Sequence, residues 1–254
     1  MKDRIYWTDT EAGTIACCDL DGQNVLEIVT GLQSPLGIAV DRAGDRLYWT
    51  DYGAHKVQRA GLDGTHIQDL VVDLPMPRHM AFDVEARHIY WTDSSANKVQ
   101  RANFDGSDVR DLVTDIPGAG IALELDAGKM YWADPFEGKK NLRANLDGSN
   151  VQDLTTGLGV QVGIALDASR DKMYWADAET DKVQCSKLDG SQVKDIVTGG
   201  GGPRCIALHL TENKMYWSTA TGDTIQRSDL DGSNIEFVIR GHGGPRGIAL
   251  VVSQ

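Results

Sequence analysis

Three arginines occupy the same position in a repeated segment of the chain, and their guanidinium groups are suited to binding an anion. Arg78, Arg204 and Arg246 each stand directly before a triplet that reads Gly-Ile-Ala or a close variant of it. In two of these triplets the glycine is replaced, by His79 and by Cys205. A guanidinium presents a planar fork of N–H donors that matches a carboxylate or a phosphate. We therefore expect a ligand-binding site for an anionic group where the fold brings these residues together.

The other copies of this position are not basic. In chain order, the residue before the triplet is Leu36, Arg78, Ala119, Val162, Arg204 and Arg246. Repeats that arose by duplication share residues for that reason alone. Arginines on a solvated rim, paired with aspartates, would produce the same pattern. The sequence leaves both interpretations open, an anion site and a plain charged rim.

A second column of the repeat is acidic. Two residues past the alanine of the triplet, the copies read Asp41, Asp83, Glu124, Asp167, His209 and Val251. A spacing of two places this column on the same face of a strand as the alanines. Oxygen ligands of this kind bind cations such as Ca²⁺, whereas an Asp at the end of a strand also hydrogen-bonds its own turn. We expect no cofactor, and an axial cation is the alternative.

The pattern of nucleophiles, acids and metal ligands does not favour an enzyme. His79 and His209 are the candidate acid–base groups, and the arginines would stabilise developing negative charge. No nucleophile–base arrangement is visible, and the cysteines, at positions 17, 18, 185 and 205, form no CxxC pair. We predict neither catalytic residues nor metal ligands. Unpaired thiols suit a reducing compartment, so the prediction is a cytoplasmic protein, or a secreted one if a leader has been removed.

A repeat of about 42 residues sets all these positions. A tetrapeptide that starts with Tyr-Trp recurs at intervals of 41 to 43 residues, beginning at Tyr6, Tyr48, Tyr90, Tyr131, Tyr174 and Tyr216. An Asp-Gly step follows each copy, at Asp21, Asp63, Asp105, Asp147, Asp189 and Asp231. Periods of this length are typical of propellers and solenoids.

Each repeat predicts four short strands. In the second repeat these are residues 35–41, 46–51, 56–62 and 66–72, which are rich in Val, Ile, Tyr and Trp and separated by Gly/Asp turns. Four-stranded units repeated around an axis are the blades of a β-propeller. The Tyr and Trp side chains should pack between blades, with the Thr and Asp of the tetrapeptide as acceptors for their N–H and O–H groups. The prediction is an all-β, six-bladed propeller.

The phase of the repeat at the two ends predicts how the ring closes. The chain begins at a second strand and stops after a first strand. Residues 245–254 should therefore supply the inner strand of a blade whose other strands lie within residues 1–33. The result is one domain over residues 1–254.

The charge of the chain bears on its partners. The formal net charge is -12, which disfavours nucleic acid because a polyanion repels an acidic surface. No stretch approaches the roughly 18–20 apolar residues of a membrane helix. We expect an acidic monomer that binds neither nucleic acid nor membrane.

The six in-register copies of Tyr-Trp, Asp-Gly and Gly-Ile-Ala resemble the low-density lipoprotein receptor class B, or YWTD, repeat over the whole chain. The resemblance implies a six-bladed propeller of the kind found in lipoprotein receptors, Wnt co-receptors and nidogen. It also implies a non-enzymatic module that holds protein partners on the face bearing the loops between second and third strands. Those receptors carry a cysteine-rich module after the propeller, so this chain looks more like a stand-alone microbial-type YWTD protein.

The loops after the tetrapeptide supply the remaining candidate site residues. Tyr52 and His55 lie in one such loop, and Phe136 lies in another that is one residue longer than the other five. Function concentrates on loops held by a rigid scaffold, and aromatic side chains often anchor partners. The sequence favours a binding or scaffold propeller that holds a protein or a small anionic ligand on its top face, at the mouth of the axial channel. The alternatives are an enzyme of hydrolase, cyclase or condensing type with its pocket at the same mouth, and a consensus-like repeat protein without a ligand.

Overall fold

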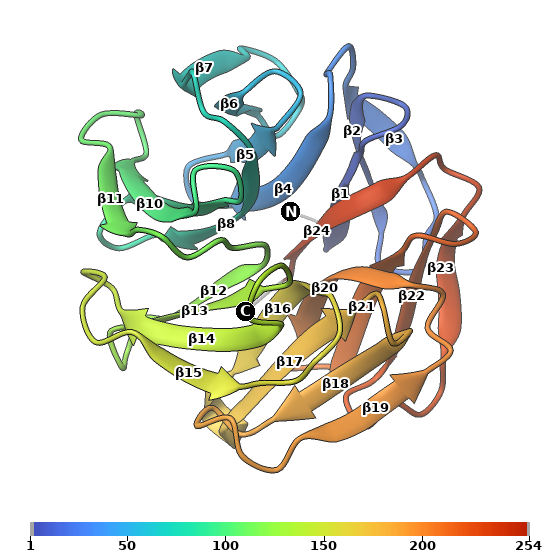
Figure 1. Cartoon of the computed structure of the whole chain (residues 1–254). Coiled ribbons are helices and arrows are strands. Elements are labelled where there is room, and N and C mark those ends of the chain that lie inside the picture. Colours follow the sequence, from blue (N-terminus) through green and yellow to red (C-terminus); the bar gives the residue numbers. More distant parts are fainter. Residues whose placement is uncertain (1–2, 253–254) are drawn as a thin grey trace.

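Six four-stranded antiparallel sheets stand around a common axis as the blades of a propeller (Figure 1). The structure, a computed structural model, describes residues 3–252. The predicted all-β, six-bladed architecture is confirmed. Apart from one 3₁₀ turn, η1 (Ala168–Arg170), the elements of this range are strands. Within it, no helix has the length and apolar character needed to cross a membrane.

The strands recur in the same order in every blade. The inner strands are β4 (Pro35–Asp41), β8 (Pro77–Asp83), β12 (Ile121–Glu124), β16 (Gln161–Asp167), β20 (Pro203–His209) and β24 (Pro245–Val251). The second strands are β1 (Arg4–Asp9), β5 (Arg46–Asp51), β9 (His88–Asp93), β13 (Lys129–Asp134), β17 (Lys172–Asp177) and β21 (Lys214–Thr219). The third strands are β2 (Thr14–Asp19), β6 (Lys56–Gly61), β10 (Lys98–Asn103), β14 (Lys140–Asn145), β18 (Lys182–Ser186) and β22 (Thr224–Asp229). The outer strands are β3 (Leu26–Val29), β7 (Gln68–Val71), β11 (Arg110–Val113), β15 (Gln152–Thr155), β19 (Lys194–Thr198) and β23 (Glu236–Arg240).

The third and the outer strand of the second repeat, β6 and β7, are shorter than the predicted ranges 56–62 and 66–72. Residues predicted at the adjoining ends of the two strands belong instead to the turn that joins them, because Gly64 and His66 adopt positive φ angles of 80° and 59°. Asp63 fixes this turn by accepting hydrogen bonds from the backbone N–H and the hydroxyl of Thr65. The inner and second strands begin and end where the sequence predicts them.

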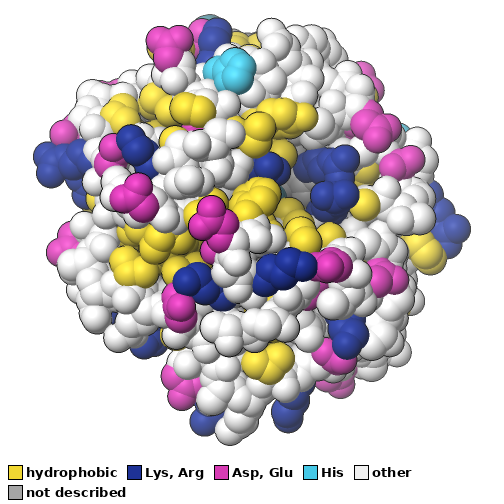
Figure 2. Space-filling model, viewed as in Figure 1, with side chains coloured by type: hydrophobic (Ala, Val, Ile, Leu, Met, Phe, Trp, Pro, Cys, Tyr) yellow, Lys and Arg dark blue, Asp and Glu magenta, His cyan; other side chains and the backbone are white. Residues whose placement is uncertain are grey.

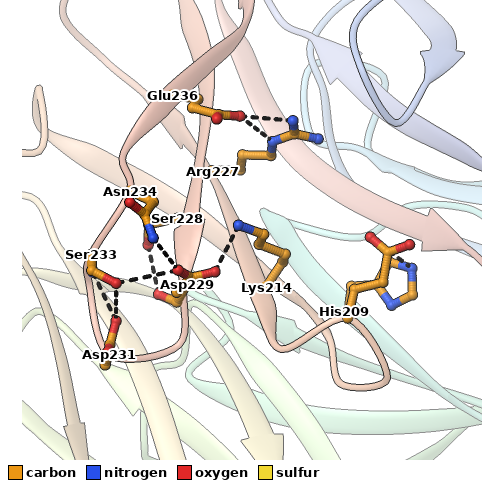
Figure 3. Close-up of polar contacts among 10 residues, drawn as sticks. His209, Lys214, Arg227, Ser228, Asp229, Asp231, Ser233, Asn234 and Glu236 are labelled. Carbon is orange, nitrogen blue, oxygen red and sulfur yellow. Dashed lines mark hydrogen bonds and ion pairs between the residues drawn. The ribbon is translucent and has the colours of Figure 1, made fainter.

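The same turn in another blade shows how polar side chains hold it (Figure 3). Asp231 accepts hydrogen bonds from the N–H and Oγ of Ser233, at 2.9 and 2.6 Å. Asp229 accepts one from Asn234 Nδ2 at 2.6 Å and pairs with Lys214 Nζ at 2.6 Å. These local contacts explain why the Asp-Gly step marks every repeat: it supplies both the acceptor and the residue with positive φ.

The ring is closed by a sheet that contains both ends of the chain. Its strand order is β24-β1-β2-β3, and Tyr6 lies opposite Ala249 in the pairing of β1 with β24. Beyond the ladder, Thr8 Oγ1 accepts a hydrogen bond from the N–H of Gly247 at 2.8 Å. The predicted closure is confirmed for residues 245–251, which form β24; residues 1–2 and 253–254 of the predicted segments lie outside the described residues.

The hydrophobic core lies between neighbouring blades, and the tetrapeptides provide its largest side chains. All six tryptophans are at most 1% exposed. The expectation that the Thr and Asp of the tetrapeptide accept hydrogen bonds from the aromatic residues is wrong. Trp49 Nε1 donates instead to Gln58 Oε1 at 3.0 Å, and Thr50 Oγ1 donates to the carbonyl of Arg78 in the next blade. Asp51 accepts from backbone N–H groups of the preceding loop, because its side chain lies at the end of the strand, beyond reach of the indole.

Candidate functional site

The three arginines of the repeat column meet on the axis of the ring. The inner strands start at the face that bears the loops between second and third strands, which we call the top face. Connections from each outer strand to the next inner strand cross this face, in front in Figure 1. In five blades the second residue of the inner strand borders one cavity of about 270 Å³, which we call the axial mouth; in the sixth blade Ala119, which precedes β12, borders it. The residues of the column that line it are Leu36, Arg78, Ala119, Val162, Arg204 and Arg246.

Figure 2 shows this face with a hollow near the axis, bordered by hydrophobic and basic side chains. Thr10, Tyr52, Met76 and His79 complete the lining of the axial mouth. The mouth therefore combines apolar walls with cationic groups on an otherwise acidic protein.

The mouth arginines influence one another. Burial lowers the pKa of Arg204, and the neighbouring charges of Arg246 and Arg78 lower it further. The Nε of Arg204 is buried and has no hydrogen-bond partner among residues 3–252. Burial also lowers the pKa of Arg78. Three like charges that share a small cavity are costly unless an anion compensates them.

Some arginines elsewhere in the described range pair with carboxylates, as Arg101 and Arg110 do with Asp108. No such ion pair involves the three arginines of the axial mouth in residues 3–252. The pairing with aspartates that a charged rim requires is thus missing there, and their N–H donors remain available to a ligand.

Arg78 is the best-positioned of the three. Its Nε donates to Ser94 Oγ at 2.9 Å, and its Nη2 lies 3.4 Å from Met76 Sδ. Its guanidinium carbon lies over the Phe136 ring, 5.5 Å from the centroid. These contacts hold the side chain while leaving the mouth side of the guanidinium open.

The two residues that replace glycine in the triplet lie in different surroundings. His79 lines the axial mouth and is only 7% exposed. Burial lowers its pKa to about 4, with a smaller contribution from Arg78, so its ring is neutral at pH 7. Cys205 lies in the interface with the next blade, where its Sγ accepts a hydrogen bond from Ile248 N at 3.4 Å. It does not line the mouth, because its side chain packs against Ile248 of the neighbouring blade.

The three predicted site residues of the loops also lie in different surroundings, and only Tyr52 lines the mouth. Phe136 is 47% exposed and lies beside Arg78. Tyr52 is half-buried and lines the mouth rather than standing free on the surface. His55 is exposed, but its Nδ1 is held against the Leu74 carbonyl at 2.9 Å and does not reach the mouth.

The acidic column lies at the far ends of the inner strands, away from the mouth. Asp41 and Asp83 accept hydrogen bonds from N–H groups of their own turns, both at 2.9 Å. His209 Nε2 lies 3.8 Å from Glu212 Oε2 (Figure 3). His209 is four positions further along its strand than His79, roughly 13 Å at the usual rise, so the two candidate acid–base groups are not brought together. Within residues 3–252, no group of three or more His, Cys, Asp or Glu side chains is arranged to hold a metal ion.

Sequence reasoning missed three contributors to the mouth. Thr10 and Met76 line it, and Ser94 positions Arg78. Thr10 and Ser94 occupy the same place, directly after the tetrapeptide, as Tyr52 does. The signal for them was therefore the loop column that also contains Tyr52.

Comparison with known proteins agrees with this architecture. The sequence matches the family described as low-density lipoprotein receptor repeat class B over residues 3–42, 45–74 and 87–115. Three segments of this six-bladed propeller therefore match the class B, or YWTD, repeat family. A search of curated protein sequences finds no match.

Solved structures similar to this propeller include one in the crystal structure of a nidogen/laminin complex, with a TM-score of 0.91, 24% identity and 99% coverage of both chains. Virginiamycin B lyase from Staphylococcus aureus gives a TM-score of 0.68 at 18% identity, over 92% of this chain and 80% of that one. TolB from Acinetobacter baumannii gives 0.79 at 14% identity, over 97% and 66%. At these identities the likeness shows the fold alone.

Proposed function

We propose that this YWTD propeller is a non-catalytic binding module whose axial mouth takes an anionic group, a carboxylate or a phosphate, from a small ligand or from a protein partner. The observation that carries the proposal is the convergence of Arg78, Arg204 and Arg246 on one cavity without an ion-pair partner among residues 3–252. Guanidinium groups bind such anions through paired, charge-assisted hydrogen bonds.

The YWTD propeller is typically a protein-binding module, and a similar propeller occurs in the complex of nidogen with laminin. The size of the mouth limits what enters it. At about 30 Å³ per water molecule, a cavity of about 270 Å³ accommodates one side chain or a small acid, but not a folded segment. A protein partner would insert an acidic side chain and take most of its contact area from the top-face loops, where Phe136 is exposed.

The titratable groups support binding rather than catalysis. A general base works best with a pKa near the operating pH, whereas the pKa of His79 is lowered to about 4. His209 lies at the other end of its strand and contacts Glu212. A neutral His79 also adds no further positive charge to the mouth, and its ring can hydrogen-bond a bound anion.

Calorimetric titration of citrate, phosphate and a series of monocarboxylates tests the proposal. The matched variants are Arg78→Ala, Arg204→Ala and the control Arg110→Ala, which changes the net charge equally but removes a side chain at the outer edge of its blade that is paired with Asp108. We expect citrate to bind the native protein and the control equally. Each mouth variant should lose at least about tenfold in affinity, since a charge-assisted hydrogen bond contributes about 1.5–3 kcal/mol. Equal binding by all four proteins, or no binding by the native protein to any of these anions, would reject the axial mouth as an anion site.

A further inference from the structure

Three blades share a polar cluster that fills the space beside their tryptophan. In the second repeat, Trp49 Nε1 donates to Gln58 Oε1 at 3.0 Å, and Gln58 Nε2 donates to Asp69 Oδ1 at 2.7 Å. Lys56 Nζ binds the other oxygen of Asp69 at 2.6 Å. The third and fifth repeats have the same cluster, formed by Trp91, Gln100, Asp111 and Lys98, and by Trp175, Gln184, Asp195 and Lys182.

The blade that closes the ring has lost two members of this cluster. In its ladders, Trp7 lies opposite Ala16, and Asp9 lies opposite Thr14. In the second repeat the partners at these two places are Gln58 and Lys56. The glutamine is therefore replaced by alanine and the lysine by threonine.

The acidic member of the cluster is retained. Glu27 lies opposite Ala16, as Asp69 lies opposite Gln58. No ion pair to Glu27 is present in residues 3–252. The carboxylate thus stands where a lysine binds in four other blades, without that lysine.

A cavity of about 270 Å³ takes the place of the two lost side chains, and we call it the closure-blade niche. It is bordered by Trp7, Asp9, Thr14, Ala16, Glu27 and His242. Trp7 is 1% exposed, and its Nε1 has no hydrogen bond within the described residues. The His242 ring stands edge-on to the indole at 6.2 Å and 70°. The niche therefore offers an indole N–H donor, carboxylates and an aromatic wall.

We propose that the closure-blade niche binds a primary alkylammonium group, supplied either by a lysine side chain of a peptide or by a free amine. The ammonium takes the place that Lys56 Nζ has beside Asp69, with Glu27 as its counter-charge. A carbonyl oxygen of the ligand takes the place of Gln58 Oε1 and accepts the Trp7 N–H. The aromatic wall further favours a cation over a neutral group. The niche and the axial mouth share no residue, so a test of amine binding in the niche does not depend on the proposed anion binding.

The test uses the full chain and follows the six indole N–H signals in ¹H–¹⁵N NMR spectra. The Trp7 signal is the one displaced by Ala16→Gln. The probes are Nα-acetyl-lysine amide, n-butylamine and the uncharged control Nα-acetyl-norleucine amide. We expect the first to shift the Trp7 signal saturably and the norleucine compound to leave it in place. Tighter binding of Nα-acetyl-lysine amide than of n-butylamine identifies a peptide lysine as the source; equal binding identifies free amines.

Two kinds of variant complete the test. The triple substitution Thr14→Lys, Ala16→Gln and Glu27→Asp rebuilds the cluster of the second repeat and should abolish ligand binding while raising the melting midpoint. Glu27→Gln should lower affinity at least about tenfold, whereas Glu85→Gln, the same change at another exposed site, should not. The proposal is overturned if neither amine shifts the Trp7 signal, or if the rebuilt protein binds Nα-acetyl-lysine amide as tightly as the native one.

Discussion

The guanidinium of Arg78 lies over the ring of Phe136, with 5.5 Å between its central carbon and the ring centroid. The two residues come from neighbouring blades, and Phe136 reaches Arg78 from the loop that is one residue longer than its five counterparts. No comparable contact to Arg204 or Arg246 is present among residues 3–252. Side-chain contacts therefore hold one arginine of the axial mouth before any ligand arrives, whereas the guanidinium groups of the other two have no hydrogen bond or ring contact within residues 3–252.

This asymmetry predicts opposite effects of two equivalent substitutions on stability. Arg204→Met removes a half-buried charge that is close to two others. Without ligand it should therefore raise the free energy of unfolding by roughly 0.5–1 kcal/mol, because replacing a residue that serves binding commonly stabilises a protein. Arg78→Met loses the Ser94 hydrogen bond and the Phe136 contact and should lower it by about 1 kcal/mol. Urea denaturation of the three proteins measures both. A loss of stability in Arg204→Met equal to that in Arg78→Met would show that Arg204 is not electrostatically strained.

The buried imidazole of His79 predicts a stability change in acid. Its pKa is about 4 in the folded protein and about 6.5 when unfolded, so between these values the unfolded chain binds more protons. Stability is then unaffected above pH 6.5 and falls as the pH drops toward 4. At pH 4.5 the loss from this residue amounts to about 2–3 kcal/mol, because one pKa unit corresponds to about 1.4 kcal/mol.

The comparison protein for this effect is His79→Gln, which cannot titrate. Carboxylates also protonate over this range, so the informative quantity is the difference between the two proteins in unfolding free energy at pH 7 and at pH 4.5. The native protein should lose about 2–3 kcal/mol more than His79→Gln. Parallel pH profiles would mean that His79 is not held neutral in the folded state.

The ring, its closure and the height of the three arginines along the propeller axis could be predicted from the sequence, because they follow from the repeat period. Once Tyr6 and Tyr216 are placed in equivalent strands, equivalent columns must lie at equal heights on the axis. Individual side-chain partners do not follow from the period. The Trp49 N–H is satisfied by Gln58 across the sheet rather than by the nearby threonine, and Cys205 points into a blade interface rather than into the mouth.

The closure-blade niche also escaped the sequence reasoning, although its signal was present. Ala16 breaks a column that reads Gln in four other repeats, and Thr14 breaks a column that reads Lys in four other repeats. Only the ladder register shows that these columns converge on the tryptophan, because the residues that touch come from three different strands. A cavity of this kind is visible once cross-strand neighbours are known.

Deletion of residues 245–254 tests the closure of the ring. The variant loses β24, including Ile248 and Val251, which are 6% and 4% exposed, and each such buried side chain contributes about 1.5–3 kcal/mol. The melting midpoint should fall by more than about 10 °C, since each kcal/mol corresponds to about 2–4 °C at this size, and the transition should broaden. Thermal unfolding followed by circular dichroism measures this. An unchanged melt would contradict the closure.

The fourth repeat offers a place where a single substitution should add stability. Trp132 is fully buried, and its Nε1 has no hydrogen-bond partner in the described range. Leu142 stands where Gln58 stands in the second repeat, and Lys140 still pairs with Asp153 beside it. Leu142→Gln would provide the acceptor for the Trp132 N–H and a donor to Asp153. Since an unsatisfied buried donor costs about 1–3 kcal/mol, we expect a net gain of about 1 kcal/mol after the loss of the buried leucine.

The reverse substitution, Gln58→Leu, is the matched control. It removes the acceptor of Trp49 Nε1 and one donor to Asp69, so it should lower the free energy of unfolding by about 1–3 kcal/mol. Urea denaturation of both variants compares the same cluster when it is built and when it is broken. A loss of stability in both variants would contradict the expectation for Leu142→Gln. It would mean that the buried leucine stabilises the fourth repeat more than the polar cluster would.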